Sequence, residues 1–140
     1  MGNKLIVSNT LGIDVGQARV GIAILSATLP TPLCTVQRAA GKAEKRVIEL
    51  LSEYKISKIV VGLPLNEDGT ESAQCDDVRR FARRIERRTG ALIVFIDEYS
   101  SSLEAEERLY ARGVSRPERA EIDALAAAII LERYLQQGSG

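Results

Sequence analysis

The sequence predicts an α/β protein built on a mixed five-stranded sheet, with an antiparallel meander, then parallel strands, and helices on its flanks. Two observations support this. Three short β-rich segments come first, and apolar runs then alternate with segments of helical periodicity. Helices between the later strands imply right-handed parallel crossovers. We expect a single domain over residues 1–140, with residues 1–9 and 136–140 frayed.

The meander is expected in the first forty residues. Residues 11–15 and 20–25 are apolar and β-rich, and a short turn containing glycine joins them. Residues 32–36 form the third expected strand. Its initial proline is typical of an edge strand or of a strand entry.

The hydrophobic period changes after this point. Val47 and Leu51 have helical spacing within residues 42–54, and residues 58–62 form a short apolar strand. A loop rich in turn residues follows through residue 71.

An amphipathic helix is expected to begin near Ala73 and to end at Gly90, and residues 92–96 form the next buried strand. The apolar face of this helix has spacing i, i+3, i+4, i+7 and consists of Val78, Phe81, Ala82 and Ile85.

Two capping boxes predict the remaining helices. Ser101 with Glu104 opens the first, and Ser115 with Glu118 opens the second, which runs to about Leu135. Ligands of such mixed sheets bind outside the carboxyl ends of the strands, so we expect the functional site there.

Composition excludes several classes of function. The chain has no histidine, which removes imidazole bases, Ser-His-Asp systems and His-ligated zinc. Cys34 and Cys75 lie far apart and form no metal-spaced pair. Residues 1–10 contain no apolar stretch of signal-peptide length, and no run could span a membrane, so a cytoplasmic protein with no membrane partner is expected. The net charge is zero, so a nucleic-acid ligand would require locally segregated charge.

Acidic residues at three places in the chain bear on function. Asp14 ends an apolar strand, although it could simply start a turn. Asp97 and Glu98 follow another buried strand, where a solvated strand end is the alternative. Asp123 lies in a helix that is apolar on nearly all sides, with no Arg or Lys within residues 122–131. A buried carboxylate must be paired, protonated or bound to a metal, and an ion pair with a distant arginine is the alternative to a metal.

If the three acids converge at one sheet edge, they form a site for a hard cation. Oxygen-only ligands favour Mg²⁺ or Mn²⁺. Two such ions can promote phosphodiester hydrolysis without a general base, which is consistent with the absence of histidine. We therefore predict a two-metal-ion endonuclease, a hydrolase whose catalytic and metal-binding residues are Asp14, Asp123 and an acid of the pair Asp97 and Glu98.

Basic residues gather on the helix that begins near Ala73. Its six arginines lie off the apolar face and could bind phosphates: Arg79, Arg80, Arg83, Arg84, Arg87 and Arg88. Pairing of the first of them with Asp76 and Asp77 on a solvated face is the alternative. A second basic patch precedes the final helix and consists of Arg112, Arg116 and Arg119. Aromatic residues are only 4% of the chain, which favours recognition of backbone and shape over base stacking.

Four segments, in this order, resemble the YqgF/RuvX family of RNase H-like proteins, known as Holliday-junction resolvases and pre-16S rRNA nucleases. They lie between about Leu11 and Leu135 and have the sequences LGIDVGQARVG (11–21), VGLPLNEDGT (61–70), DE followed by Ser101, Ser102 and Ala105 (97–105), and IDALAA (122–127). The resemblance implies an RNase H-like fold, Mg²⁺ or Mn²⁺ as cofactor, and cleavage of structured RNA or branched DNA. It also implies Asp14, Glu98 and Asp123 as ligands and Arg19 as a basic residue that contacts nucleic acid. In one departure, Tyr99 stands where the family often has arginine, which affects the expected contact with a phosphate.

Several functions compete at this point. We prefer processing of the 5′ end of pre-16S rRNA, with resolution of four-way DNA junctions in recombination as the alternative. A resolvase cuts two strands symmetrically and would call for a homodimer. The segment 14–16 followed by a hairpin also resembles the phosphate loop of actin-like kinases, but those folds need two such domains. A third alternative is a nucleic-acid-binding module without catalytic activity, which Tyr99 favours and the intact acids oppose.

Overall fold

The computed structural model describes residues 9–137 and confirms the predicted α/β fold with its mixed five-stranded sheet. The elements follow one another as β1 (Thr10–Val15), β2 (Arg19–Ser26), β3 (Leu29–Gln37), the short 3₁₀ turn η2 (Ala39–Gly41), α1 (Lys42–Glu53), β4 (Lys58–Leu63), α2 (Cys75–Thr89), β5 (Leu92–Asp97), α3 (Ser101–Ala111) and α4 (Arg119–Gln136). The sheet order is β3-β2-β1-β4-β5. The meander β1-β2-β3 is antiparallel, and β4 and β5 join it in parallel, as predicted.

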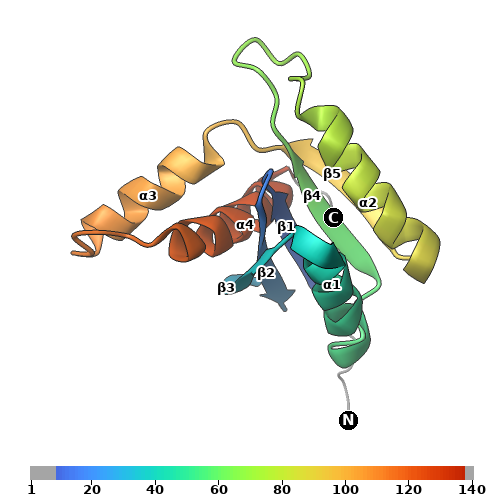
Figure 1. Cartoon of the computed structure of the whole chain (residues 1–140). Helices are drawn as coiled ribbons and strands as arrows, with labels where there is room; N and C mark the ends of the chain where they lie inside the picture. The colour runs from blue at the N-terminus through green and yellow to red at the C-terminus, as the bar shows by residue number, and fades with distance from the viewer. Residues whose placement is uncertain (1–8, 138–140) are drawn as a thin grey trace.

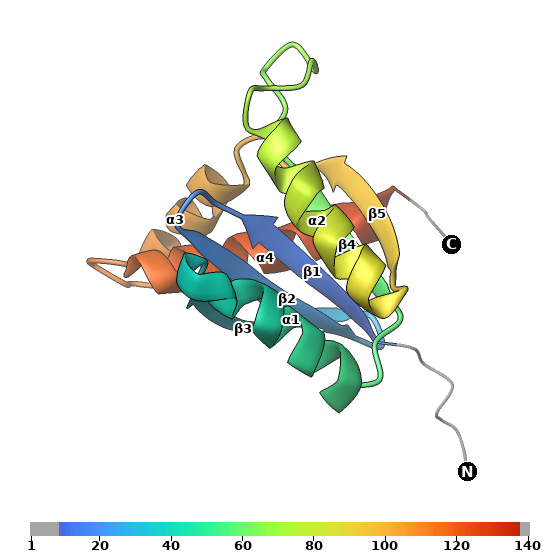
Figure 2. The same ribbon diagram turned by 45° about the vertical axis from the view of Figure 1, so that its right-hand side comes forward.

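Helices cover both faces of the sheet. Figures 1 and 2 show α1 and α2 side by side on one face and α4, with α3 against it, on the other. The alternation of side chains along β1 assigns its residues to these two layers. Leu11 and Ile13 join the core under α1 and α2, together with Phe81. Asp14 is out of phase with these residues and therefore faces α4.

The layer under α4 is packed unusually closely. A Cβ at Gly21 would collide with the backbone carbonyl of Asp123, and a Cβ at Gly12 would lie 2.5 Å from Cγ of Leu131. Alanines on α4, such as Ala126 and Ala127, are fully buried. Small residues on both sides therefore bring the helix axis near the strands, and Asp123 comes with it.

Neither of the two predicted capping boxes is formed. Ser101 is the first helical residue of α3 and is buried, and Ser100 precedes it with φ +64° and no side-chain cap, so Ser101 and Glu104 form no capping box. The cap of α4 is Glu118, which forms a box with Glu121 instead of with Ser115. Each true cap lies outside the Ser-x-x-Glu pattern because tertiary packing sets where the chain enters the helix.

The predicted fraying falls mainly on residues 1–8 and 138–140, which lie outside the described residues. Within the described part, α4 continues through Gln136, and the Asn9 amide donates a hydrogen bond of 3.2 Å to the backbone carbonyl of Tyr54. Residues 9–137 contain no helix long and apolar enough to cross a bilayer.

Candidate active site

A polar cleft of about 420 Å³ opens where β1 ends, and all three predicted acids line it. Asp14 comes from β1, Glu98 directly follows β5, and Asp123 comes from the second turn of α4. The strands end at this edge because β1, β4 and β5 run parallel to one another. The site thus lies at the edge that the topology predicts.

Asp14, which is half-buried, and Glu98, which is buried, form a close pair of carboxyls. Burial raises the pKa of Asp14 above its usual range. Burial and, to a lesser extent, the negative charge of Asp14 raise the pKa of Glu98 to about 10. The two carboxyls lie near enough to share a hydrogen bond, which requires that one of them carry a proton. In the absence of a cation, the pair therefore holds a proton at neutral pH.

Glu98 also presents an unsatisfied oxygen. Its Oε1 atom is buried and accepts no hydrogen bond within residues 9–137. A glycine provides the space for this oxygen, because a Cβ at Gly62 of β4 would collide with it. An orphaned buried carboxylate oxygen beside a second carboxylate fits a hard divalent cation, which neutralises both charges.

Asp123 stands apart from this pair in one respect. Its Oδ2 accepts a hydrogen bond of 2.8 Å from Nε of Arg19, at the start of β2. This is the distant arginine that the sequence left open as the alternative to a metal. Within residues 9–137 no group of three acidic or thiol side chains is arranged to hold one metal ion. The geometry therefore suits binding of a cation by Asp14 and Glu98, and the role of Asp123 as a third ligand stays a prediction.

Neutral polar residues to which the sequence alone assigned no role line the same cleft. Gln17 belongs to the turn between β1 and β2, Gln74 precedes α2, and Ser102 lies in the first turn of α3. Isolated glutamines and serines carry no spacing signal, so only the fold identifies them. Arg119, at the first position of α4, completes the lining as a cation opposite the acids.

Arg38 holds the turn that carries Gln17. Its guanidinium donates to both Asp77 oxygens at 2.6 and 3.1 Å and to the carbonyl of Gly16 at 3.0 Å. Its backbone N–H donates to the carbonyl of Ala18 at 2.9 Å. Arg38 thus connects this turn to α2. It pairs with Asp77, one of the acids that the helix spacing had suggested as partners of the arginines of α2.

The predicted phosphate-binding arginines of α2 fall into two groups. Arg79 pairs with Glu71 and lies over the ring of Phe95, and Arg84 pairs with Glu44 of α1. The others are exposed and form no ion pair within the described residues: Arg80, Arg83, Arg87 and Arg88. Arg80 lies nearest the cleft, since it shares a hollow with Gln17 and Gln74. Arg116 is exposed in the loop before α4.

A solved structure and the fold agree on the class of protein. RuvC of Thermus thermophilus, solved in complex with a Holliday junction substrate, matches with a TM-score of 0.59 over 95% of this chain and 98% of that chain, at 17% sequence identity. This likeness is one of fold. The sheet order, with acids at the carboxyl ends of its strands, defines the class as an α/β protein with the RNase H-like fold.

Sequence comparison then gives the family. The family model described as RuvX, Holliday junction resolvase, matches residues 8–137, and the chain belongs to this family. A relative from Anaeromyxobacter dehalogenans is 44% identical over 91% of this chain and 96% of its own length. A relative from Syntrophus aciditrophicus is 42% identical over 89% and 86%, respectively. Both relatives are named, provisionally, as pre-16S rRNA nucleases.

Proposed function

We propose that this protein is an Mg²⁺- or Mn²⁺-dependent endonuclease that hydrolyses phosphodiester bonds at the 5′ end of pre-16S rRNA. The observation that carries the proposal is the pair formed by half-buried Asp14 and buried Glu98, with the orphaned Oε1 atom of Glu98. Such a pair is costly to bury unless a cation joins it. The names of the relatives support the choice of substrate, and such a substrate would place the protein in the cytoplasm.

Each side of the cleft has its own task in this proposal. Asp14 and Glu98 would bind the cation directly, and they would release their shared proton when they do so. Asp123 would be the third ligand, with Arg19 holding it in place from β2 until then. When bound, two divalent cations supply the positive charge that activates water and offsets the charge on the leaving oxygen.

The neutral and basic residues would hold the substrate. Gln17, Gln74 and Ser102 can donate hydrogen bonds to phosphate or sugar oxygens beside the acids, and Arg119 can bind a neighbouring phosphate. The free arginines of α2 would extend this contact away from the cleft, beginning at Arg80. Arg79 and Arg84 would contribute less, because each already has a carboxylate partner.

Resolution of Holliday junctions is the second candidate, because the description of the matching family model names that activity. The same acidic pair would cut DNA as well as RNA. Symmetric cutting would require two copies of the cleft, and thus a homodimer.

A cleavage assay separates these candidates. Purified protein is incubated with Mg²⁺ or Mn²⁺ and, in parallel, with an RNA that spans the 5′ end of 16S rRNA and with a four-way DNA junction. Asp14→Asn should abolish cleavage. Asp97→Asn is the matched control: Asp97 is exposed, and its Oδ1 only accepts the backbone N–H of Tyr99 at 2.7 Å, so cleavage should persist.

Each outcome has a definite meaning. RNA cleavage that is lost in Asp14→Asn and kept in Asp97→Asn supports the rRNA nuclease. Paired symmetric nicks in the junction, without RNA cleavage, support the resolvase. If folded protein cuts neither substrate with either cation, the nuclease proposal is wrong, and a binding module without catalysis takes its place.

A further inference from the structure

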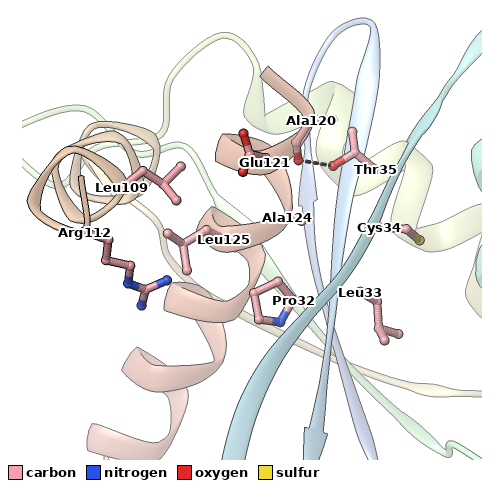
Figure 3. A pocket seen from close by; sticks show the side chains of 10 residues that line it. All are labelled: Pro32, Leu33, Cys34, Thr35, Leu109, Arg112, Ala120, Glu121, Ala124 and Leu125. Carbon is pink, nitrogen blue, oxygen red and sulfur yellow. Dashed lines mark hydrogen bonds between the residues drawn. The ribbon is translucent and has the colours of Figure 1, made fainter. Parts of the chain in front are cut away.

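A second hollow, of about 340 Å³, lies beside the N-terminal half of α4. It is formed by β3, the end of α3 and the beginning of α4, as Figure 3 shows. Its lining consists of Pro32, Leu33, Cys34, Thr35, Leu109, Arg112, Ala120, Glu121, Ala124 and Leu125. Its volume is within the range of small-ligand sites.

The hollow and the acidic cleft are neighbours. Ala120 and Ala124 of α4 line the hollow, whereas Arg119 and Asp123 line the cleft, so the two sites share one stretch of helix. A nucleic-acid strand that occupied both the hollow and the cleft would pass over the first turns of α4. None of the residues with which the nuclease proposal builds the reaction lies in the hollow.

The lining of the hollow is mainly apolar and includes one cation without a partner among the described residues, Arg112. Pro32, Leu109 and Leu125 supply apolar walls, and the Arg112 side chain extends between α3 and α4 (Figure 3). The Arg112 side chain has no hydrogen-bond or ion-pair partner within residues 9–137. The other polar groups are already used, since the Thr35 hydroxyl donates to the Ala120 carbonyl at 2.7 Å and the carboxylate of Glu121 accepts the backbone N–H of Glu118 at 3.1 Å.

Flat apolar walls with one unpaired guanidinium suit a planar ring that carries hydrogen-bond acceptors. A nucleobase has that chemistry, and arginine binds base edges and also stacks on base faces. The surroundings favour a polyanion as well, because Arg116 and Arg119 follow in the chain between Arg112 and the hollow's residues on α4. The phosphates on either side of the base would lie near these cations.

Strand β3, which forms one side of the hollow, argues against a protein as the occupant. β3 is an edge strand, and an exposed edge can accept a strand from another chain. Here Pro30 and Pro32 remove two backbone donors from that edge, so pairing with a peptide or with a second copy of β3 is disfavoured.

We propose that this hollow binds one unstacked base of the nucleic-acid strand that is cut, near the scissile phosphate. The inference rests on the proposed nuclease function and adds to it a site of base recognition. The site lies between α4 and β3, beside the cleft that contains Asp14, Glu98 and Asp123. An unpaired base fits such a site, and a base held in a duplex does not.

The test measures binding without cleavage. Asp14→Asn protein is titrated with the 5′ pre-16S RNA and, separately, with the four-way DNA junction, each carrying one abasic residue that is moved stepwise past the cut. Removal of the base that occupies the hollow should weaken binding about tenfold at one position. 2-Aminopurine at that position should change fluorescence on binding, and the protein, which has no tryptophan, adds little background.

Two variants assign the effect to the hollow. Arg112→Gln removes the free cation at an exposed position, and Ala124→Leu fills the space from α4. Both should bind the intact substrate more weakly and lose the sensitivity to the abasic residue. Lys45→Gln, an equal charge change at an exposed position of α1, should behave like the parent protein.

If the abasic profile of both folded variants equals that of the parent, the proposal is refuted. It is also refuted if sedimentation shows a dimer that Ala124→Leu dissociates, because the hollow is then a contact between copies. Absence of binding to either intact substrate would instead refute the proposed function itself.

Discussion

Substitution of Gly62 by alanine should show whether the position of the Glu98 side chain affects activity separately from the stability of the fold. The added Cβ would collide with Oε1 of Glu98 and lie 2.6 Å from Cδ1 of Ile130. Overpacking of this kind costs about 1–3 kcal/mol of the free energy of unfolding. Glu98 must also move from its place beside Asp14, and a displacement of about 1 Å in a catalytic group can lower the rate about a hundredfold.

Gly12→Ala is the matched control. Gly12 lies on β1, beside β4, and faces the same helix, but the three atoms nearest its added Cβ all belong to Leu131, with Cγ at 2.5 Å. Its cost in stability should be similar, and its cleavage rate should stay near that of the parent protein. Urea unfolding gives the stability of both variants, and cleavage is measured at a temperature where both are folded.

Two results would refute the reasoning. A folded Gly62→Ala protein with the parent rate would mean that Glu98 does not need its present position. An equal loss of rate in Gly12→Ala would mean that the close packing of α4, and not the seat of Glu98, controls the reaction.

Three further predictions follow from charge and hydrogen bonding. The folded, metal-free state keeps the proton on Glu98 up to about pH 10, whereas the unfolded carboxyl loses it near pH 4.5, so the free energy of unfolding should fall as pH rises between these values. Urea unfolding at pH 5 and pH 9 should show a smaller fall in Glu98→Gln than in the parent protein. Equal falls in the two proteins would contradict the pairing of Glu98 with Asp14. Arg38→Lys loses the bidentate bond to Asp77 and the bond to the turn, and it should lower kcat about tenfold with little change in KM. Arg108→Lys alters a similar bidentate pair between α3 and α4 and should leave kcat unchanged. Equal effects of the two variants in steady-state kinetics would show that only stability is involved. Arg87→Gln should lower the slope of log binding constant against log salt by about 1, and Arg79→Gln should change it less, because Arg79 is already paired; the reverse order would place the phosphates elsewhere.

The order of strands and helices could be predicted because hydrophobic periodicity is local. The alternating β segments and the i, i+3, i+4 face of α2 each depend on neighbours along the chain. The caps of α3 and α4 could not, since Ser100 adopts a left-handed conformation and Glu118 caps α4 in place of Ser115. Those choices depend on how each helix packs against α4 or the sheet.

The candidate site was predictable in part for the same reason. The sequence identifies Asp123 as an acid in a buried helix, but its partner Arg19 lies 104 residues away. The role of Gly62 depends likewise on an oxygen of Glu98 that reaches it only in the folded sheet. Glycines and glutamines at such positions carry no periodic signal, so the three-dimensional structure is needed to find them.

The two walls of the cleft should differ in their dynamics. Arg38 ties the turn after β1 to α2 through its guanidinium and its backbone N–H, and the Gly16 N–H donates to the carbonyl of Arg19 at 2.8 Å. The other wall, from Tyr99 to Ser102, contains Ser100 at φ +64°, a conformation that costs a residue other than glycine some free energy. Release of that strain favours local opening at the start of α3. Amide hydrogens of the turn should therefore exchange slowly and those around Ser100 quickly, so that substrate enters and product leaves past α3 while the Asp14 wall stays fixed.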